Sequence, residues 1–125
     1  MKNAISWFEI PAQNFERAKS FYEQVLNATL TREEVEGQDD EMAFLPADLE
    51  NGGIGGCIVS GKGYEPSESG ALVYLNGGND LSVPLARVEP AGGKIVMPKT
   101  AIGPHGFIAQ FIDSEGNKVA FHSDN

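Results

Sequence analysis

The chain has few side chains of the kinds that commonly carry out chemistry. Its 125 residues include two histidines, His105 and His122, and a single cysteine, Cys57. Glu9 is a carboxylate within a largely apolar N-terminal segment. A carboxylate beside an imidazole can form a general base together with the partner that orients it. These residue types suggest proton transfer, provided that the fold brings them together.

Each of these residues also has a structural interpretation. Glu9 could pair with a lysine or a backbone group, and His122, near the C-terminus, could be exposed to solvent. His105 lies between proline and glycine, in a loop that could close over a ligand or stabilise a turn. Cys57 lies in a glycine-rich strand, where a cysteine serves as a small buried hydrophobe or as a nucleophile.

The elements that must position these residues occur twice in the same order. A predicted strand (4–10) precedes an amphipathic helix (15–26) and three strand-like runs, with Asn14 as the N-cap and Asn27 at the helix end. A second strand (71–76) precedes a helix over about 81–88 and three more strand-like runs. The pattern predicts an α+β fold of two β-α-β-β-β modules, whose curled mixed sheet encloses a cleft. Module 1 is expected over about 1–60, a linker over 61–70 and module 2 over about 71–125, within one domain (1–125).

Composition limits the functions that this chain can have. The formal net charge of −9 disfavours nucleic acid and anionic membranes as partners. No apolar run reaches the roughly 20 residues needed to span a bilayer, and the chain enters a predicted strand at once, so we expect no signal peptide. One cysteine excludes an internal disulfide framework, and we expect a cytoplasmic protein.

Several motifs resemble the vicinal oxygen chelate superfamily, which includes glyoxalase I, bleomycin-resistance proteins and extradiol dioxygenases. They cover most of the chain in the order typical of that family. The resemblance implies paired β-α-β-β-β modules, assembly as a homodimer, a small-molecule ligand and, often, a divalent metal in the cleft. The motifs are Ala18-x-x-Phe21-Tyr22-x-x-Val25-Leu26, then Leu85-Ala86-Arg87-Val88 with Ala91-Gly92-Gly93-Lys94, and finally Phe111-x-Asp113-x-x-Gly116-Asn117.

The positions where this family places its metal ligands carry other residue types here. By the resemblance, these positions fall on Trp7, at or beside Cys57, on Val73 (or on Leu72 if the register slips) and on Ala120. Tryptophan, valine and alanine cannot ligate a divalent metal, and one thiolate cannot hold a metal alone. We therefore expect no metal and no other cofactor at the usual site.

Alternation along the strands extends the predicted cleft beyond these positions. Glu9 lies two residues after Trp7 and His122 lies two after Ala120, so both are expected to face the cleft. Trp7 would supply a flat apolar wall or belong to the core, and Gln110 would bond a ligand or face solvent. The predicted ligand pocket consists of Trp7, Cys57, Val73, Gln110 and Ala120.

Three functions are compatible with these residues. The first is a metal-independent lyase or isomerase that acts on a small carbonyl compound through Glu9, His122 or His105. The second is a binding protein that sequesters a small drug or metabolite without catalysis. The third is a metalloenzyme whose ligands have moved to Glu9, His122 and His105.

Overall fold

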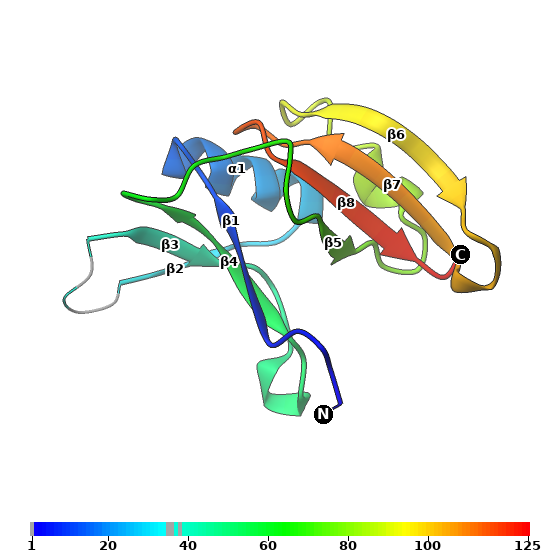
Figure 1. The fold of residues 1–125 in the computed structure, drawn as a ribbon, viewed down its shortest axis with the longest axis horizontal. Coiled ribbons are helices and arrows are strands. Elements are labelled where there is room, and N and C mark those ends of the chain that lie inside the picture. Colours follow the sequence, from blue (N-terminus) through cyan, green and yellow to red (C-terminus); the bar gives the residue numbers. More distant parts are fainter. Residues whose placement is uncertain (1, 35–36, 38) are drawn as a thin grey trace.

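The computed structural model describes residues 2–34, 37 and 39–125, which form two separate four-stranded mixed sheets (Figure 1). The first sheet has the strand order β1-β4-β3-β2 and the second has the order β5-β8-β7-β6. In each sheet the first strand of its module pairs in parallel with the last, and the remaining pairs are antiparallel. The predicted duplication is therefore present in the fold, and the sheets do not close into a barrel.

Each module follows the predicted element order. The first contains β1 (Trp7–Pro11), α1 (Phe15–Leu26), β2 (Thr31–Glu33), β3 (Glu41–Phe44), η1 (Leu49–Asn51) and β4 (Gly55–Ser60). The second contains β5 (Val73–Asn76), α2 (Ser82–Leu85), β6 (Lys94–Ala101), η2 (Gly103–His105), β7 (Phe107–Ile112) and β8 (Lys118–Ser123). Strands β2 and β3 pair as an antiparallel hairpin, and residues 35, 36 and 38 between them lie outside the described part.

Helix α1 has the predicted bounds because its two caps are strong. The Asn14 side chain accepts a hydrogen bond from the Arg17 backbone N–H, and Asn27 ends the helix in the left-handed conformation with φ 51°. The buried stripe of α1 packs on β3 and β4. Its Phe21 ring also lies 6.2 Å from the Phe111 ring in β7. One helix therefore contributes to the core beneath both sheets.

Helix α2 is shorter than predicted, covering four residues instead of the expected run over about 81–88. Pro84 lies inside this segment and has no backbone N–H for a helical hydrogen bond. After Leu85 the chain continues as turns, in which Arg87 and Val88 bond to carbonyls three residues before them. Leu81, Leu85 and Val88 are all buried, because these turns preserve a helical winding.

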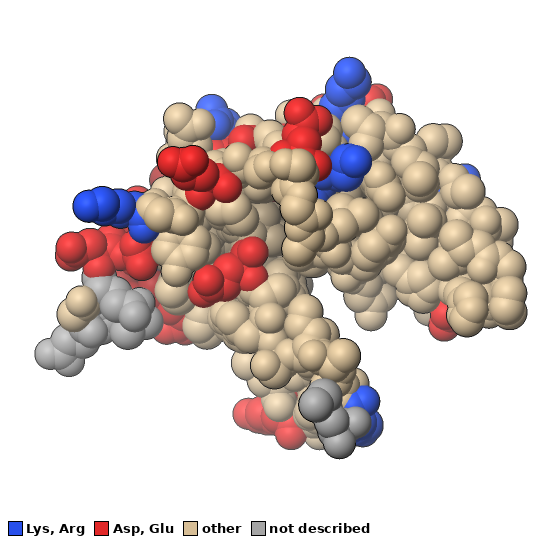
Figure 2. All heavy atoms as spheres, viewed as in Figure 1, with Lys and Arg blue, Asp and Glu red and all other residues tan. Residues whose placement is uncertain are grey.

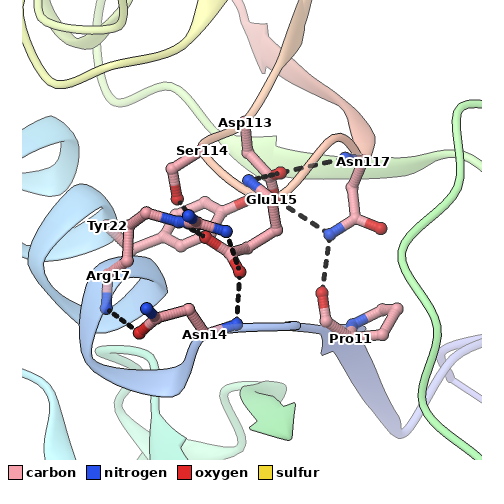
Figure 3. Close-up of polar contacts among 8 residues, drawn as sticks. All are labelled: Pro11, Asn14, Arg17, Tyr22, Asp113, Ser114, Glu115 and Asn117. Atoms are coloured by element: carbon pink, nitrogen blue, oxygen red, sulfur yellow. Dashed lines mark hydrogen bonds and ion pairs between the residues drawn. The ribbon is translucent and has the colours of Figure 1, made fainter.

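A polar cluster joins α1 to the β7–β8 turn, and we call it the inter-module cluster (Figure 3). The Arg17 guanidinium donates two hydrogen bonds to Glu115, at 2.7 and 3.1 Å, and the Asn14 backbone N–H donates a third at 2.6 Å. The buried Tyr22 hydroxyl donates to Asp113 at 2.6 Å. The cluster consists of Pro11, Asn14, Arg17, Tyr22, Asp113, Ser114, Glu115 and Asn117.

These bonds hold a buried carboxylate in its charged form. Burial alone would raise the pKa of Glu115, but the hydrogen bonds from Arg17, Asn14 and Ser114 outweigh burial and lower that pKa. Burial, followed by the charge and hydrogen bond of Asp113, raises the pKa of Tyr22 well above its ordinary value. The cluster therefore fixes α1 against the C-terminal hairpin, which sets the position of each sheet relative to the other.

Candidate functional site

In the first sheet, Trp7 and Glu9 lie on the face opposite the core. Phe8 and Ile10 point the other way, since Ile10 belongs to the buried core and Phe8 packs against it. Trp7 is 39% exposed and its ring packs edge-to-face on Phe44, with 5.3 Å between centroids. Trp7 and Glu9 therefore share one face of β1, and Phe8 and Ile10 share the other.

Glu9 lies beside Cys57, its partner in the parallel β1–β4 ladder. Cys57 is completely buried, and burial followed by the Glu9 charge raises the pKa of its thiol to about 11. Glu9 also raises the pKa of the Tyr64 hydroxyl. Cys57 is therefore held as a neutral thiol, which favours the interpretation of a small buried side chain over that of a nucleophile.

In the second sheet, the register differs from the prediction at β5. Val73 pairs with Val119 and packs against the core, whereas Tyr74 pairs with Ala120. The expectation that Val73 shares a face with Ala120 was therefore wrong by one residue, and Tyr74 takes that place. Gln110 lies on the other side of Ala120, in β7, and is half-buried on the same face.

The next residues along these strands bring both histidines to one cavity. His122 pairs with Asn76 on one side and with Ile108 on the other. A cavity of about 710 Å³, which we call the His cavity, lies here, at the end of β8. It is lined by Tyr74, Asn76, Ile102, His105, Ile108 and His122, among others.

A hydrogen bond fixes the tautomer of His122. Its Nε2 lies 2.6 Å from the backbone carbonyl oxygen of His105. Because a carbonyl oxygen only accepts, Nε2 must carry the proton in this bond, and the neutral ring then has its lone pair on Nδ1. His122 is therefore an oriented imidazole with one basic nitrogen. His105 contributes through its backbone, as part of η2.

The His cavity contains little charge. Among the described residues that line it, Asp124 is the charged one, and none is a lysine or arginine. Figure 2 shows that acidic side chains gather over the half of the molecule formed by the first sheet. The face of the other half seen in this view is mostly uncharged. This environment favours a neutral ligand over an anionic one.

Glu9 lies in a different place from the histidines. It lines a smaller cavity of about 210 Å³, together with Ser67, Ser69 and Lys118. Lys118 begins β8, and His122 lies four residues further along that strand, roughly 13 Å away at 3.3 Å per residue. The structure therefore brings His105 and His122 together but separates them from Glu9.

The side chains at the expected metal positions do not suit a divalent metal. Tryptophan, a neutral buried thiol and alanine occupy three of these positions, and Tyr74 takes the fourth after the register correction. Within residues 2–34, 37 and 39–125, no group of three or more His, Cys, Asp or Glu side chains could hold a metal ion. His105, His122 and Glu9 do not form such a group in the described part of the chain.

Tyr74 and Asn76 are site residues that the sequence reasoning missed. Asn76 was seen only as the end of a predicted strand. Its place two residues after Tyr74 would have put it on the same face, had the register of β5 been known. In the structure its side-chain oxygen accepts a hydrogen bond from the Gly78 backbone N–H at 2.8 Å, which leaves the amide N–H groups as donors.

Comparison with known proteins gives a consistent picture of the fold. The family model described as Glyoxalase/Bleomycin resistance protein/Dioxygenase superfamily matches residues 4–121. A search of curated proteins found no match. In the described part of the chain, neither helix has the length and apolar character required to cross a membrane.

Solved structures with the same fold are distant in sequence. The trypanothione-dependent glyoxalase I of Leishmania major is 16% identical, with a TM-score of 0.71 over 98% of this chain and 88% of that one. The fosfomycin resistance protein FosX of Listeria monocytogenes is 12% identical, with a TM-score of 0.65 over 100% and 94%. Glyoxalase I from Zea mays is 21% identical, with a TM-score of 0.67, and this chain matches 48% of its length.

Proposed function

The chain belongs to the Glyoxalase/Bleomycin resistance protein/Dioxygenase superfamily, and from this premise we propose that it transfers a proton on a small neutral carbonyl compound without a divalent metal. The observation that carries the proposal is the 2.6 Å contact between His122 Nε2 and the His105 carbonyl oxygen. This contact leaves Nδ1 as the basic nitrogen of an oriented ring. His122 acts as the base without help from Glu9, because the two residues line different cavities.

The reaction class is an enolisation, the step that an isomerase and a lyase can share. Nδ1 of His122 accepts the proton from the carbon next to the carbonyl group, and the C–H electron pair forms the double bond of an enolate. Negative charge then develops on the carbonyl oxygen, which the Asn76 amide N–H can stabilise. With an α-hydroxy carbonyl compound, an isomerase returns the proton to the former carbonyl carbon of the enediolate while the α-hydroxyl proton moves to the first oxygen, so the carbonyl group shifts by one carbon. A lyase instead lets the enolate re-form the carbonyl group as the bond from the β-carbon to the leaving group breaks and the leaving group departs with its electron pair.

Exchange of substrate protons with solvent tests this proposal. Protein dialysed against a chelator is incubated with 2-butanone or hydroxyacetone in D₂O, and loss of the protons next to the carbonyl group is followed by ¹H NMR. We expect exchange above the protein-free rate, and a fall of roughly 10²-fold or more in His122→Asn. Glu50→Gln, on the exposed η1 turn, is the matched control and should exchange at the wild-type rate.

Two results would contradict the proposal. Equal exchange by the wild type and His122→Asn would show that His122 is not the base. Exchange that appears only after Ni²⁺ or Zn²⁺ is added would instead support a metalloenzyme with relocated ligands.

The mostly apolar lining of the His cavity, with Tyr74, Ile102 and Ile108, also suits sequestration without catalysis. Saturable chemical-shift changes in the His122 ring without proton exchange would favour this second function. That result would support the His cavity as a binding site and contradict the proposed proton transfer.

A further inference from the structure

A second cavity, of about 550 Å³, lies between the two modules, and we call it the apolar cavity. Its lining comes from β1, from the end of α1, from the segment before β4 and from β5, and none of the described residues in it is charged. Figure 2 shows a hollow between the two halves of the molecule. The side chains that line the apolar cavity include Ile5, Phe8, Leu26, Leu45, Ile54 and Leu75.

The apolar cavity and the His cavity meet at β5. Tyr74, Leu75 and Asn76 line both of them. β5 is an edge strand, paired with β8 on one side only, and Leu75 faces the core whereas Tyr74 and Asn76 face away from it. The two cavities therefore share three consecutive residues of one strand and are adjacent at its unpaired edge.

From this adjacency we propose that both cavities bind a single ligand, a neutral carbonyl compound with an unbranched apolar tail. The carbonyl end lies at His122 and Asn76, and the tail passes over the edge of β5 into the apolar cavity. This inference rests on the proposed function, because it assigns the carbonyl end to the same histidine.

Size and charge support this ligand class. Each cavity falls within the roughly 300–1,000 Å³ that small-molecule sites occupy. The apolar cavity offers hydrocarbon contacts along its length, with Asn76 at the strand edge as a hydrogen-bond donor. A charged tail would lose its hydration there without gaining a partner, so the lining selects an aliphatic chain.

A series of 2-alkanones from four to ten carbons is the probe. Dissociation constants are measured by titration, following the ¹³C-labelled His122 ring by NMR. We expect affinity to rise about fourfold with each added methylene, as transfer of a methylene group from water predicts, until the tail fills the cavity.

Tryptophan substitutions test whether the apolar cavity holds the tail independently of the carbonyl end. Ile54→Trp fills the apolar cavity from a half-buried position, and it should abolish the dependence on chain length while 2-butanone binds as before. Ala71→Trp, from an exposed position in the same lining, serves if the first variant does not fold. Val96→Trp places the same side chain on exposed β6, outside both cavities, and should behave as the wild type.

The outcomes distinguish this inference from the proposed function. If 2-butanone and 2-decanone perturb His122 with equal affinity, the tail site is wrong although the proposed function stands. If no alkanone perturbs His122, the proposed function fails, and the inference fails with it. If Ile54→Trp instead converts a dimer into a monomer and alkanones show no dependence on chain length, the apolar cavity is an interface between copies, which also overturns the inference.

Discussion

Side chains on the same face of a sheet can differ widely in their exposure to solvent. Cys57 and Trp7 both lie on the face of the first sheet opposite the core, yet Cys57 is completely buried and Trp7 is 39% exposed. The difference follows from position, because β4 lies inside the sheet whereas β1 lies at its edge. Reactivity at this face therefore depends on strand order as well as on residue type.

Cys57 should be unreactive in the folded protein. Because burial raises the pKa of the thiol to about 11, only about one thiol in a thousand is ionised at pH 8, and disulfide reagents require the thiolate. We expect 5,5′-dithiobis(2-nitrobenzoate) to react with native protein at least roughly a hundredfold more slowly than with glutathione. One equivalent should react at once in guanidinium chloride, and complete labelling of native protein within minutes would contradict the burial described here.

At the scale of elements, the contact between α1 and the β7–β8 turn is the most polar in the core. The Glu115 side chain is fully buried, whereas its partner Arg17 is 53% exposed. A buried carboxylate that loses its donors is costly, since its remaining charge has no compensation. The stability of this contact therefore depends on Glu115 remaining ionised.

Glu115→Gln should lower the free energy of unfolding by about 1–3 kcal/mol at pH 7, measured by chemical denaturation. Because the pKa of Glu115 is lowered on folding, its contribution is complete above the unfolded value of 4.5 and is lost as the pH falls through the folded value. The difference between wild type and variant should therefore shrink in acid.

Glu16→Gln is the matched control, because Glu16 is 75% exposed in the first turn of α1. Its free energy of unfolding should stay within about 0.5 kcal/mol of the wild type at neutral pH. A constant difference between wild type and Glu115→Gln down to pH 3 would contradict the lowered pKa.

Local signals predicted the elements well where they were unambiguous. Two asparagine caps fixed α1 at both ends, whereas Pro84 shortened α2 despite its apolar periodicity. The register of β5 could not be predicted because Leu72 to Leu75 is apolar at every position apart from the tyrosine hydroxyl, so alternation does not identify the buried face. That ambiguity concealed Tyr74 and Asn76 as site residues.

At the scale of the whole molecule, apolar side chains are exposed on the first sheet and the segments beside it. Leu49 is 53% exposed and Trp7 is 39% exposed. Leu49 and Trp7 lie on either side of Gly55, because a Cβ built there would meet both of them. An exposed apolar patch of this kind is typical of a protein–protein interface.

We expect a homodimer, as the family resemblance implies, with this patch in its interface. Sedimentation at micromolar concentration should give about twice the chain mass of 13.4 kDa. Leu49→Glu should shift the protein toward the monomer, because it places a charge in an apolar contact. Val83→Glu changes a similarly exposed residue on α2, at 55% exposure, and should leave the mass unchanged. A wild-type monomer at high micromolar concentration would contradict the prediction.

The distance between the candidate site residues could not be predicted from the alternation of residues along the strands. Strand alternation put Glu9 and His122 on the cleft face in the prediction, but alternation carries no information on the distance between sheets, and the two residues line different cavities. Their separation follows from how the modules dock, which depends on contacts such as Tyr22 with Asp113. The adjacency of the two cavities at β5 has the same origin and could not have been predicted from spacing.

The inter-module cluster has a consequence for synthesis of the chain. The bond from the Asn14 N–H to Glu115 spans 101 residues, and that from Asn117 to the Pro11 carbonyl spans 106. At roughly 5–20 residues per second, α1 is completed seconds before its partners have been translated. Until then the Tyr22 hydroxyl lacks Asp113 as a hydrogen-bond acceptor, and the Phe21 ring lacks the Phe111 ring. Final docking of the first module must therefore wait until the C-terminal hairpin has left the ribosome.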